Sequence, residues 1–452
     1  MFAERGTTRM KKILPYALTL SLVGQSYAFA SGLEKSVLWS GRNAGVAGAV
    51  TSSVGGPEAL YFNPAGLGGT TGLAASINFS PTFSKFQAPI AALGQTLPTT
   101  SSNTNFSPPA AALVSYGLTP QLGIGVGYYA AGGSKVVFDG IALAPVLPSA
   151  QLKSDIGLTE FSVGGGYEVL DGLRIGLAWR ALFVKADLAF QGSPVGAATA
   201  TAYSTFTGAS ATRYNGFRVG LQYAPRDSRW GIGANWRSAI DFVANNVNAT
   251  AQLLTLPTSP PTTSATALAP YNGSTTTAAI GATLPQQLSI GGYFDIFEKT
   301  WRVLAQYDFT EYHRLNQLFV SGSLTLPTPV GVTPLSSVTL NWKNQSNIRL
   351  GTEYKLLENV VLRGGYVFTS QVTANDIPLS TFAAPGPAHS VFLGAGSTII
   401  PNLSIDGALE LTWISATVAS TDAPAGGSVA AGNYKDMAYA AHVGVTYAFG
   451  TF

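Results

Sequence analysis

The residues best suited to chemistry are arginines and carboxylates that recur at alternate positions along short segments. Arg174 and Arg180, for example, share one parity within a run whose other parity is apolar. Because a guanidinium can bind a carboxylate through two parallel hydrogen bonds, such residues could hold the acid group of a ligand. They could equally form a ladder of ion pairs with acids of the same parity. The set comprises Arg174, Arg180, Arg218, Arg237, Arg302, Arg349 and Arg363, with Asp308, Glu353, Asp406 and Glu410.

The same search gives little support for catalysis. The chain has three histidines, His313, His389 and His442. His389 is adjacent to Ser390 in a predicted strand, so the two side chains point to opposite faces, and His442 shares its face with no obvious serine. There is no G-x-S-x-G elbow, zinc-ligand spacing or phosphate-binding loop, and no cysteine. We therefore predict no enzymatic activity, no metal and no cofactor.

The segments that carry the charged residues alternate with period two, which is typical of β-strands. In the clearest run, Leu173, Ile175, Leu177 and Trp179 form an apolar face opposite arginine, glycine and alanine. Alternation alone fits a soluble β-sandwich as well as a membrane barrel. The barrel is favoured because aromatic residues lie near the ends of the apolar faces, as in interface girdles. Glycine is also the commonest residue on the polar faces, as a crowded barrel interior would require.

Composition and the N-terminal segment both point to an exported membrane protein. Charged residues make up 10% of the chain, against roughly 25% in typical globular domains. Residues 1–30 resemble a secretory signal, with Lys11 and Lys12 before an apolar run and Ala28-Phe29-Ala30 as a cleavage site. The rest of the chain contains no apolar stretch of about 20 residues, so it has no spanning helix. A net charge of +3 without a basic run does not indicate nucleic-acid binding.

The spacing of turns predicts the number of strands. Six short connections rich in Asp, Asn and Pro alternate with long segments rich in small and polar residues, as in barrels with short turns on one side and long loops on the other. Six short turns joining seven hairpins give 14 antiparallel strands, which we place in residues 71–452. The short connections are Thr119-Pro120, Asp171-Gly172, Arg226-Asp227, Glu298-Lys299, Glu358-Asn359 and Pro401-Asn402, and the long segments are 87–108, 191–211, 245–282 and 417–433.

Residues 31–70 lack the alternation and precede the first predicted strand, so we expect them to plug the barrel. The segment ends near Asn63-Pro64-Ala65-Gly66, where Pro64 fixes its φ angle and Asn63 can bond nearby backbone. We expect a rigid polar corner in which Asn63 bonds an inward arginine or carboxylate. Inward apolar side chains could line a pocket; they are Leu182, Leu304, Val361, Val367 and Phe392.

The run Tyr61–Gly66 resembles the hatch motif of the FadL/TodX family, and so does its position between a signal segment and the first strand. The resemblance implies an all-β protein: a monomeric 14-stranded transmembrane β-barrel in outer-membrane lipid, with a small, partly helical hatch in the lumen. It implies transport of long-chain fatty acids or similar hydrophobic small molecules. It also implies lateral release at a kinked third strand, where Gly132 and Gly133 would permit a bulge.

A general diffusion porin for small polar solutes is the alternative within the transport class, since it would share the barrel but lack the plug. An outer-membrane hydrolase is the alternative among enzymes. The sequence leaves open the identity of the cargo, the residues that bind it, and whether Met1 or Met10 begins the chain.

Overall fold

The structure is a computed structural model. It describes residues 32–33, 37, 39–93, 95–192, 201–226, 228–255, 263–271, 274–297, 300–326, 331–335, 337–373, 381–419 and 430–449. The predicted signal segment 1–30 lies outside the described residues, as do parts of the long segments and the turn residues Asp227, Glu298 and Lys299. None of the described helices is long and apolar enough to cross a membrane.

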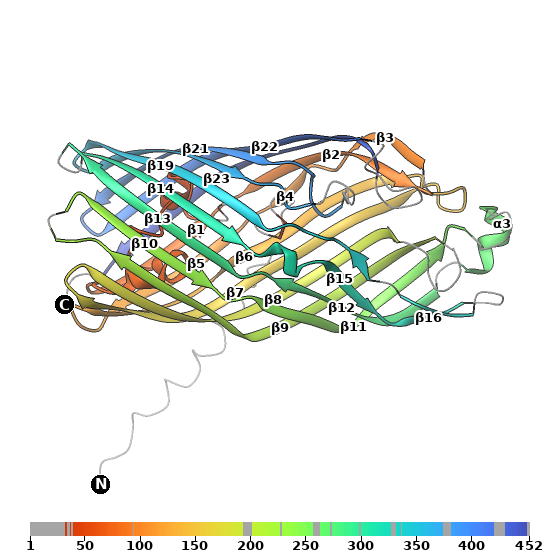
Figure 1. The fold of residues 1–452 in the computed structure, drawn as a ribbon, viewed down its shortest axis with the longest axis horizontal. Coiled ribbons are helices and arrows are strands. Elements are labelled where there is room, and N and C mark those ends of the chain that lie inside the picture. Colours follow the sequence, from red (N-terminus) through yellow and green to blue (C-terminus); the bar gives the residue numbers. More distant parts are fainter. Residues whose placement is uncertain are drawn as a thin grey trace, which may run out of the picture.

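Strands form most of the fold, and the α-helices lie toward its two ends (Figure 1). The strands are β1 (Leu73–Phe79), β2 (Thr82–Ala92), β3 (Gln95–Ser101), β4 (Asn105–Ser107), β5 (Ala110–Gly117), β6 (Leu122–Ile141), β7 (Ala150–Leu170), β8 (Leu173–Gly192), β9 (Ala202–Tyr223), β10 (Trp230–Arg237), β11 (Ile240–Leu253), β12 (Ser274–Leu284), β13 (Gln287–Ile296), β14 (Trp301–Thr310), β15 (Gln317–Ser321), β16 (Ser323–Thr325), β17 (Val332–Pro334), β18 (Val338–Thr339), β19 (Gln345–Leu357), β20 (Val360–Thr369), β21 (Ala388–Ile400), β22 (Leu403–Val418) and β23 (Gly432–Ala448). The helices and 3-10 turns are α1 (Gly41–Gly45), α2 (Ala59–Phe62), η1 (Pro64–Leu67), α3 (Ala265–Leu268), η2 (Ala269–Tyr271) and η3 (Tyr312–Arg314).

Several of these strands are consecutive pieces of one longer strand that is interrupted by a kink. Both β1 and β2 pair with β23, so they form the first strand, and β3, β4 and β5 form the second. Four further strands of the wall are each divided into two pieces that share neighbouring strands: β10–β11, β12–β13, β14–β15 and β18–β19. The described wall closes where Ala74 of β1 faces Ala448 of β23. The result is a closed barrel of 14 antiparallel strands, which confirms the predicted fold.

The outward face of the barrel is apolar, whereas polar and charged side chains point inward near one end. Ile77 and Leu409 are each 67% exposed on the outside, while Arg180 on the inside is 0% exposed. Soluble proteins rarely expose so much contiguous apolar surface. The surface suits a lipid bilayer, so the structure excludes the soluble sandwich that alternation alone allowed.

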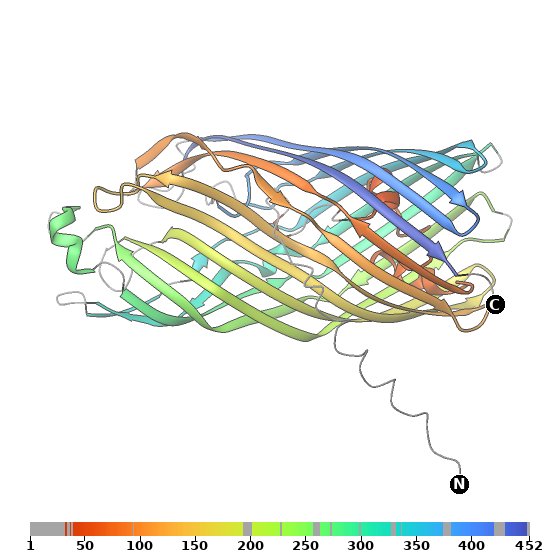
Figure 2. The same cartoon turned by 180° about the vertical axis from the view of Figure 1, so that it is seen from behind.

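Residues 40–69 fold inside the barrel, where α1, α2 and η1 lie close to the end that carries the C-terminus (Figures 1 and 2). We call this the hatch end, and the opposite end, which carries α3, the loop end. The described short turns that the sequence predicted, such as Asp171-Gly172 and Pro401-Asn402, join strands at the hatch end. The hatch is therefore surrounded by the rim with short turns, as the predicted plug requires.

Apolar side chains cluster in the loop-end half of the lumen. We call these residues the luminal apolar cluster; its largest members come from β8, β9, β11 and the segments after β18 and β20. They include Leu182, Phe190, Phe206, Phe242, Trp342 and Phe382. Of the predicted pocket residues, Leu182 belongs to this cluster, whereas Leu304, Val367 and Phe392 are buried around the hatch and Val361 lines a cavity beside it.

The topology predicts which positions are accessible from outside the cell. The chain lacks cysteine, so single-cysteine variants can be labelled without background. We expect a membrane-impermeant maleimide to label Ala267→Cys, at an exposed position of α3, on intact cells, and to label Asn359→Cys in a hatch-end turn only after lysis. Labelling of Asn359→Cys on intact cells, with Ala267→Cys protected, would show that the barrel has the opposite orientation in the membrane.

Candidate functional site

The hatch is fixed to the wall through the side chain of Asn63, which is fully buried at the start of η1. Its Oδ1 accepts a hydrogen bond from Ala65 N at 3.1 Å. Its Nδ2 donates to Thr51 O of the hatch at 2.7 Å, and to Leu221 O and Ala234 O of the wall at 3.0 and 3.2 Å. Leu221 and Ala234 face each other in β9 and β10. One amide therefore joins two parts of the hatch to two neighbouring strands.

The partners of Asn63 differ from those expected. We predicted an inward arginine or carboxylate, and this was wrong, because the wall acceptors are backbone carbonyl oxygens. The reason lies in the wall, where Gly220 is opposite the Asn63 side chain and a Cβ added there would collide with Asn63 Oδ1. With no side chain in between, the amide reaches the strand backbone directly.

Gly220 belongs to a row of glycines that crosses four adjacent strands. Gly123, Gly166, Gly176 and Gly220 lie in β6, β7, β8 and β9, and each is the direct cross-strand partner of the next. We call this row the glycine platform. A Cβ at any of them would come within 3.0 Å of the hatch backbone or of Asn63, distances that real Cβ atoms essentially never show. Because these residues lack a Cβ, the hatch and wall backbones can touch.

A second anchor is the buried carboxylate of Glu58. Its Oε2 accepts hydrogen bonds from Ser40 Oγ at 2.7 Å and Asn43 Nδ2 at 2.5 Å, both in or beside α1. Its Oε1 accepts from Ser76 Oγ at 3.0 Å and Asn78 Nδ2 at 2.9 Å, both in β1. Glu58 therefore joins the two halves of the hatch to the first strand. Sequence reasoning missed it; the one available signal was an isolated acid in a segment with few charges.

Arg218 and Arg349, two of the predicted arginines, donate hydrogen bonds to the hatch backbone. Arg218 donates from Nη1 to Leu60 O at 3.1 Å, and its guanidinium lies over the Tyr61 ring, 4.8 Å from the centroid. Arg349 donates from Nη1 to Ala47 O at 2.9 Å while its Nε binds Asp308 Oδ2 at 2.5 Å. Both arginines therefore connect the wall to carbonyl oxygens of the hatch, which is one of the roles expected for them.

Most other predicted charges form ion pairs along the wall, which supports the ladder interpretation. Arg363 bridges Glu353 at 2.9 Å and Asp406 at 2.7 Å, beside Gly45 of α1. The remaining pairs are Arg174 with Glu168 at 3.0 Å, Arg302 with Asp295 at 2.6 Å, and the fully buried Arg180 with Glu160. Arg237 instead donates to Pro285 O at 3.3 Å.

Glu410 takes part in a cluster that the sequence did not reveal. Its Oε2 lies 2.9 Å from His442 Nε2, and His442 Nδ1 lies 2.9 Å from Ser80 Oγ. The sequence showed no obvious serine on the face of His442, and Ser80 becomes its partner only because closure of the barrel brings the first and last strands together. Ser80 is 0% exposed, so the hydroxyl is closed to solvent and substrate. The cluster joins the kink between β1 and β2 to β22 and β23.

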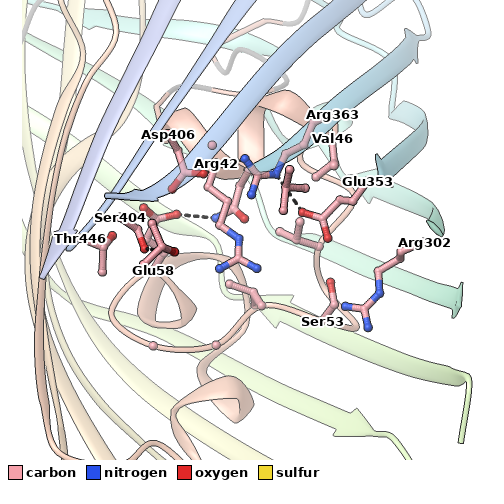
Figure 3. Close-up of a pocket in the computed structure, with 18 of the residues that line it drawn as sticks. Arg42, Val46, Ser53, Glu58, Arg302, Glu353, Arg363, Ser404, Asp406 and Thr446 are labelled. Carbon is pink, nitrogen blue, oxygen red and sulfur yellow. Dashed lines mark hydrogen bonds and ion pairs between the residues drawn. The ribbon is translucent and has the colours of Figure 1, made fainter. Parts of the chain in front are cut away.

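Two polar cavities border the hatch. One of about 400 Å³ lies between the hatch and the wall, where Figure 3 shows the Arg42 side chain reaching in among Glu58, Glu353 and Arg302. The other, of about 50 Å³, lies on the loop side of the hatch. Its lining includes Arg218, Arg237, Arg349, Asp308, Gln345 and Asn347. Among the described residues, no group of side chains has the composition of a metal site.

The smaller cavity contains polar groups with unused hydrogen-bonding capacity. Arg218 Nε and Gln345 Nε2 are buried and have no hydrogen-bond partner among the described residues. With three arginines and one aspartate, the lining carries a formal charge of +2. The luminal apolar cluster begins directly beyond it, since Leu284 precedes Gln287 along one wall strand and Trp342 precedes Gln345 along another. A cationic polar pocket therefore borders the apolar half of the lumen.

The wall is discontinuous at the third strand. From Gly123 to Tyr129, β6 pairs with β5, but residues 130–141 have no strand partner on that side among the described residues. Relative to β7, the register of β6 shifts between Ala130 and Gly132, and Gly133 has a φ of 150°. The structure therefore has a kink at the two glycines that the sequence singled out.

Groups from the N-terminal segment take the place of the missing strand partner. Trp39 Nε1 donates to Ala130 O at 2.9 Å, and Gly133 N donates to Leu33 O at 2.7 Å. The two wall strands meet again where Asn103 N donates to Val137 O at 2.8 Å. Ala131 and Leu33 both belong to the luminal apolar cluster, so the cluster extends to this gap.

Comparison with known proteins identifies the class. The sequence model of the family described as outer membrane protein transport protein (OMPP1/FadL/TodX) matches residues 21–449. The chain therefore belongs to the FadL/TodX family of bacterial outer-membrane transport proteins. No curated protein sequence matches it.

Solved structures of similar fold agree with this assignment. A FadL homologue of Pseudomonas aeruginosa has a TM-score of 0.71 at 15% identity, over 93% of this chain and 100% of that one. The toluene transporter TodX of P. putida has a TM-score of 0.67 at 14% identity, over 94% and 99%. The toluene transporter TbuX of Ralstonia pickettii has a TM-score of 0.63 at 17% identity, over 90% and 98%. At these identities the likeness establishes the fold.

The glycine platform predicts a site where one methyl group should dislodge the hatch. Gly176→Ala places a Cβ against Pro64 and Ala65, and overpacking of this kind costs about 1–3 kcal/mol. We expect an intact barrel with a looser hatch, seen as unchanged heat-modifiable migration together with larger and noisier single-channel conductance.

The matched control is Gly364→Ala, where the added Cβ would find its nearest neighbour, Thr352 Cγ2, at 3.6 Å. It should behave as the wild type does. Equal conductance in both variants would show that the platform does not hold the hatch.

Proposed function

We propose that the protein carries hydrophobic small molecules inward across the outer membrane, and that they leave the lumen sideways through the gap beside β6. The observation that carries this proposal is the extent of the luminal apolar cluster. It lies in the loop-end half of the barrel and reaches Ala131 and Leu33 at the gap. An apolar solute that enters from the loop end would therefore stay in apolar surroundings until it reaches the bilayer.

The hatch end offers no comparable route. A solute that continued toward it would meet the charged side chains around Arg218, Arg349 and Glu58. Transferring an apolar molecule into such surroundings forfeits the favourable free energy of apolar burial, and displacing a buried carboxylate from its hydrogen bonds is costly. Passage into the bilayer avoids both costs, so lateral release is the favoured exit.

The arrangement of charge supports amphiphilic cargo such as long-chain fatty acids. The cavity on the loop side of the hatch places three arginines and one aspartate at the end of the luminal apolar cluster. A carboxylate could bind there through charge-assisted hydrogen bonds while its tail stays among apolar side chains. Neutral aromatic compounds, the cargo named for the TodX and TbuX structures, would use the cluster without this cavity.

A general diffusion porin is less consistent with the structure. The hatch occupies the hatch end in direct backbone contact with the wall, and cavities of about 400 and 50 Å³ lie beside it. The proposal also includes no catalytic step, because the Ser80–His442–Glu410 cluster is buried. We expect one chain to act alone in outer-membrane lipid, since a single chain contains the closed barrel, the hatch and the gap beside β6.

Uptake by cells that carry a Gly133→Val variant tests the exit. The φ of 150° at Gly133 is strained for any side chain and most of all for a β-branched one. We expect uptake of a labelled long-chain fatty acid and of toluene to fall roughly tenfold, equivalent to about 1.4 kcal/mol, with barrel assembly unchanged.

Gly165→Val provides the control, because its Cβ would face outward with nothing nearer than 3.4 Å. Normal uptake by Gly133→Val would place the exit elsewhere. Normal fatty-acid and toluene uptake in cells that lack the protein altogether would refute the transport function itself.

A further inference from the structure

Four adjacent strands, β2, β23, β22 and β21, form one outward face at the loop end (Figures 1 and 2). Their direct cross-strand partners define rows across this face. One row is apolar or aromatic throughout: Phe83, Tyr439, Leu411 and Val391. The next row toward the loop end is Lys85, Met437, Trp413 and His389, and the third contains Gln87, Lys435 and Ser415. The face therefore changes from apolar to basic and polar within two rows.

The two lysines are positioned to act on the same ligand. Lys85 faces Met437 and Lys435 faces Gln87, so the lysines are diagonal neighbours on one face, within reach of long side chains. Both are exposed, and neither forms a hydrogen bond or ion pair with any described residue. The acids of these strands, such as Glu410 and Asp436, are buried on the inward side. The described outward face thus carries uncompensated positive charge.

Aromatic side chains stand beside the lysines. The rings of Trp413 and His389 stack with centroids 5.5 Å apart and an interplanar angle of 21°. Tyr366 Oη lies 2.7 Å from His389 Nδ1, which fixes the orientation of the imidazole. Aromatic and basic side chains in this order are typical of the boundary between hydrocarbon and headgroups.

Lysines also occur on the outward face of β6, β7 and β8, and most of them are paired. On β6, β7 and β8, Lys153 lies 3.3 Å from Asp187 and 3.6 Å from Asp155, and Lys135 lies 3.9 Å from Asp155. Two aspartates on that face offset part of the charge of three lysines, and Lys185 is exposed without an ion pair to a described residue. The face formed by β2 and β21–β23 differs in two respects: its two lysines are diagonal neighbours, and the described acids of these strands all lie on the inward side.

We propose that Lys85, Lys435, Trp413 and His389, which we call the lysine patch, bind the phosphate headgroup of an anionic lipid in the outer leaflet. The two ammonium groups would donate to the phosphate oxygens, and the acyl chains would lie along Phe83, Tyr439 and Leu411. The charge and its place at the edge of the apolar band fit a lipid phosphate. This site is independent of the cargo and of the proposed exit.

The test compares lipid retained by the purified full-length barrel, measured by native mass spectrometry after incubation with mixed micelles of phosphatidic acid and phosphatidylcholine. We expect the wild type to retain phosphatidic acid preferentially. At ~1 kcal/mol per lysine near a charged surface, the Lys85→Ala/Lys435→Ala variant should lose this preference roughly tenfold or more. The control, Lys153→Ala, removes a paired lysine and should retain the wild-type preference. Heat-modifiable migration confirms that each variant is folded.

Two results would overturn the proposal. The first is equal retention of phosphatidic acid by the wild type and the double lysine variant. The second is displacement of the lipid by millimolar inorganic phosphate, which would indicate a site for free anions rather than for a lipid headgroup.

Discussion

Direct contact between the backbone of the hatch and the backbone of the wall is the constraint on which the rest of the structure depends. Within a bilayer, every backbone polar group needs a partner inside the protein, so the wall strands use their donors and acceptors in the ladder. A plug can bond to the backbone of such a wall only where side chains leave room. The glycine platform provides that room, and Asn63 uses it to share its amide protons among carbonyl oxygens of the hatch and of two strands.

The same constraint links the hatch to the gap in the third strand. An unpaired strand edge at membrane depth costs several kcal/mol for each unsatisfied group, and β6 presents such an edge beyond Tyr129. Trp39 and Leu33 precede the hatch in the chain. Trp39 donates a hydrogen bond to that edge and Leu33 accepts one from it. The segment that leads into the hatch thereby also satisfies part of the open edge of β6.

The sequence predicted the architecture well, because strand alternation and turn chemistry are local signals. The face assignment of Leu173–Arg180 and the turns at Asp171-Gly172 and Pro401-Asn402 required no long-range information. The kink at Gly132-Gly133 was also visible as paired glycines within a strand. The interruptions elsewhere in the wall were not, because a break such as Ser80-Pro81 depends on packing against strands distant in sequence.

The partners of individual polar residues could not be predicted, because they too depend on contacts between parts of the chain that are distant in sequence. Parity placed the arginines in the lumen, but whether Arg349 contacts Ala47 depends on how the hatch is seated. Ser80 and His442 are 362 residues apart and meet only because the barrel closes. The expectation for Asn63 failed because the glycine row was recognised as a composition bias and not as a surface at which backbones touch.

Hydrogen exchange tests the central claim, that the hatch stays seated while cargo leaves beside β6. The purified barrel in nanodiscs would be measured by mass spectrometry with and without saturating cargo, because local opening appears as loss of amide protection. The account predicts faster exchange for residues 130–136 of β6 and unchanged protection for residues 40–69. Faster exchange across residues 40–69, with β6 unchanged, would mean that cargo passes through the hatch and would contradict the account.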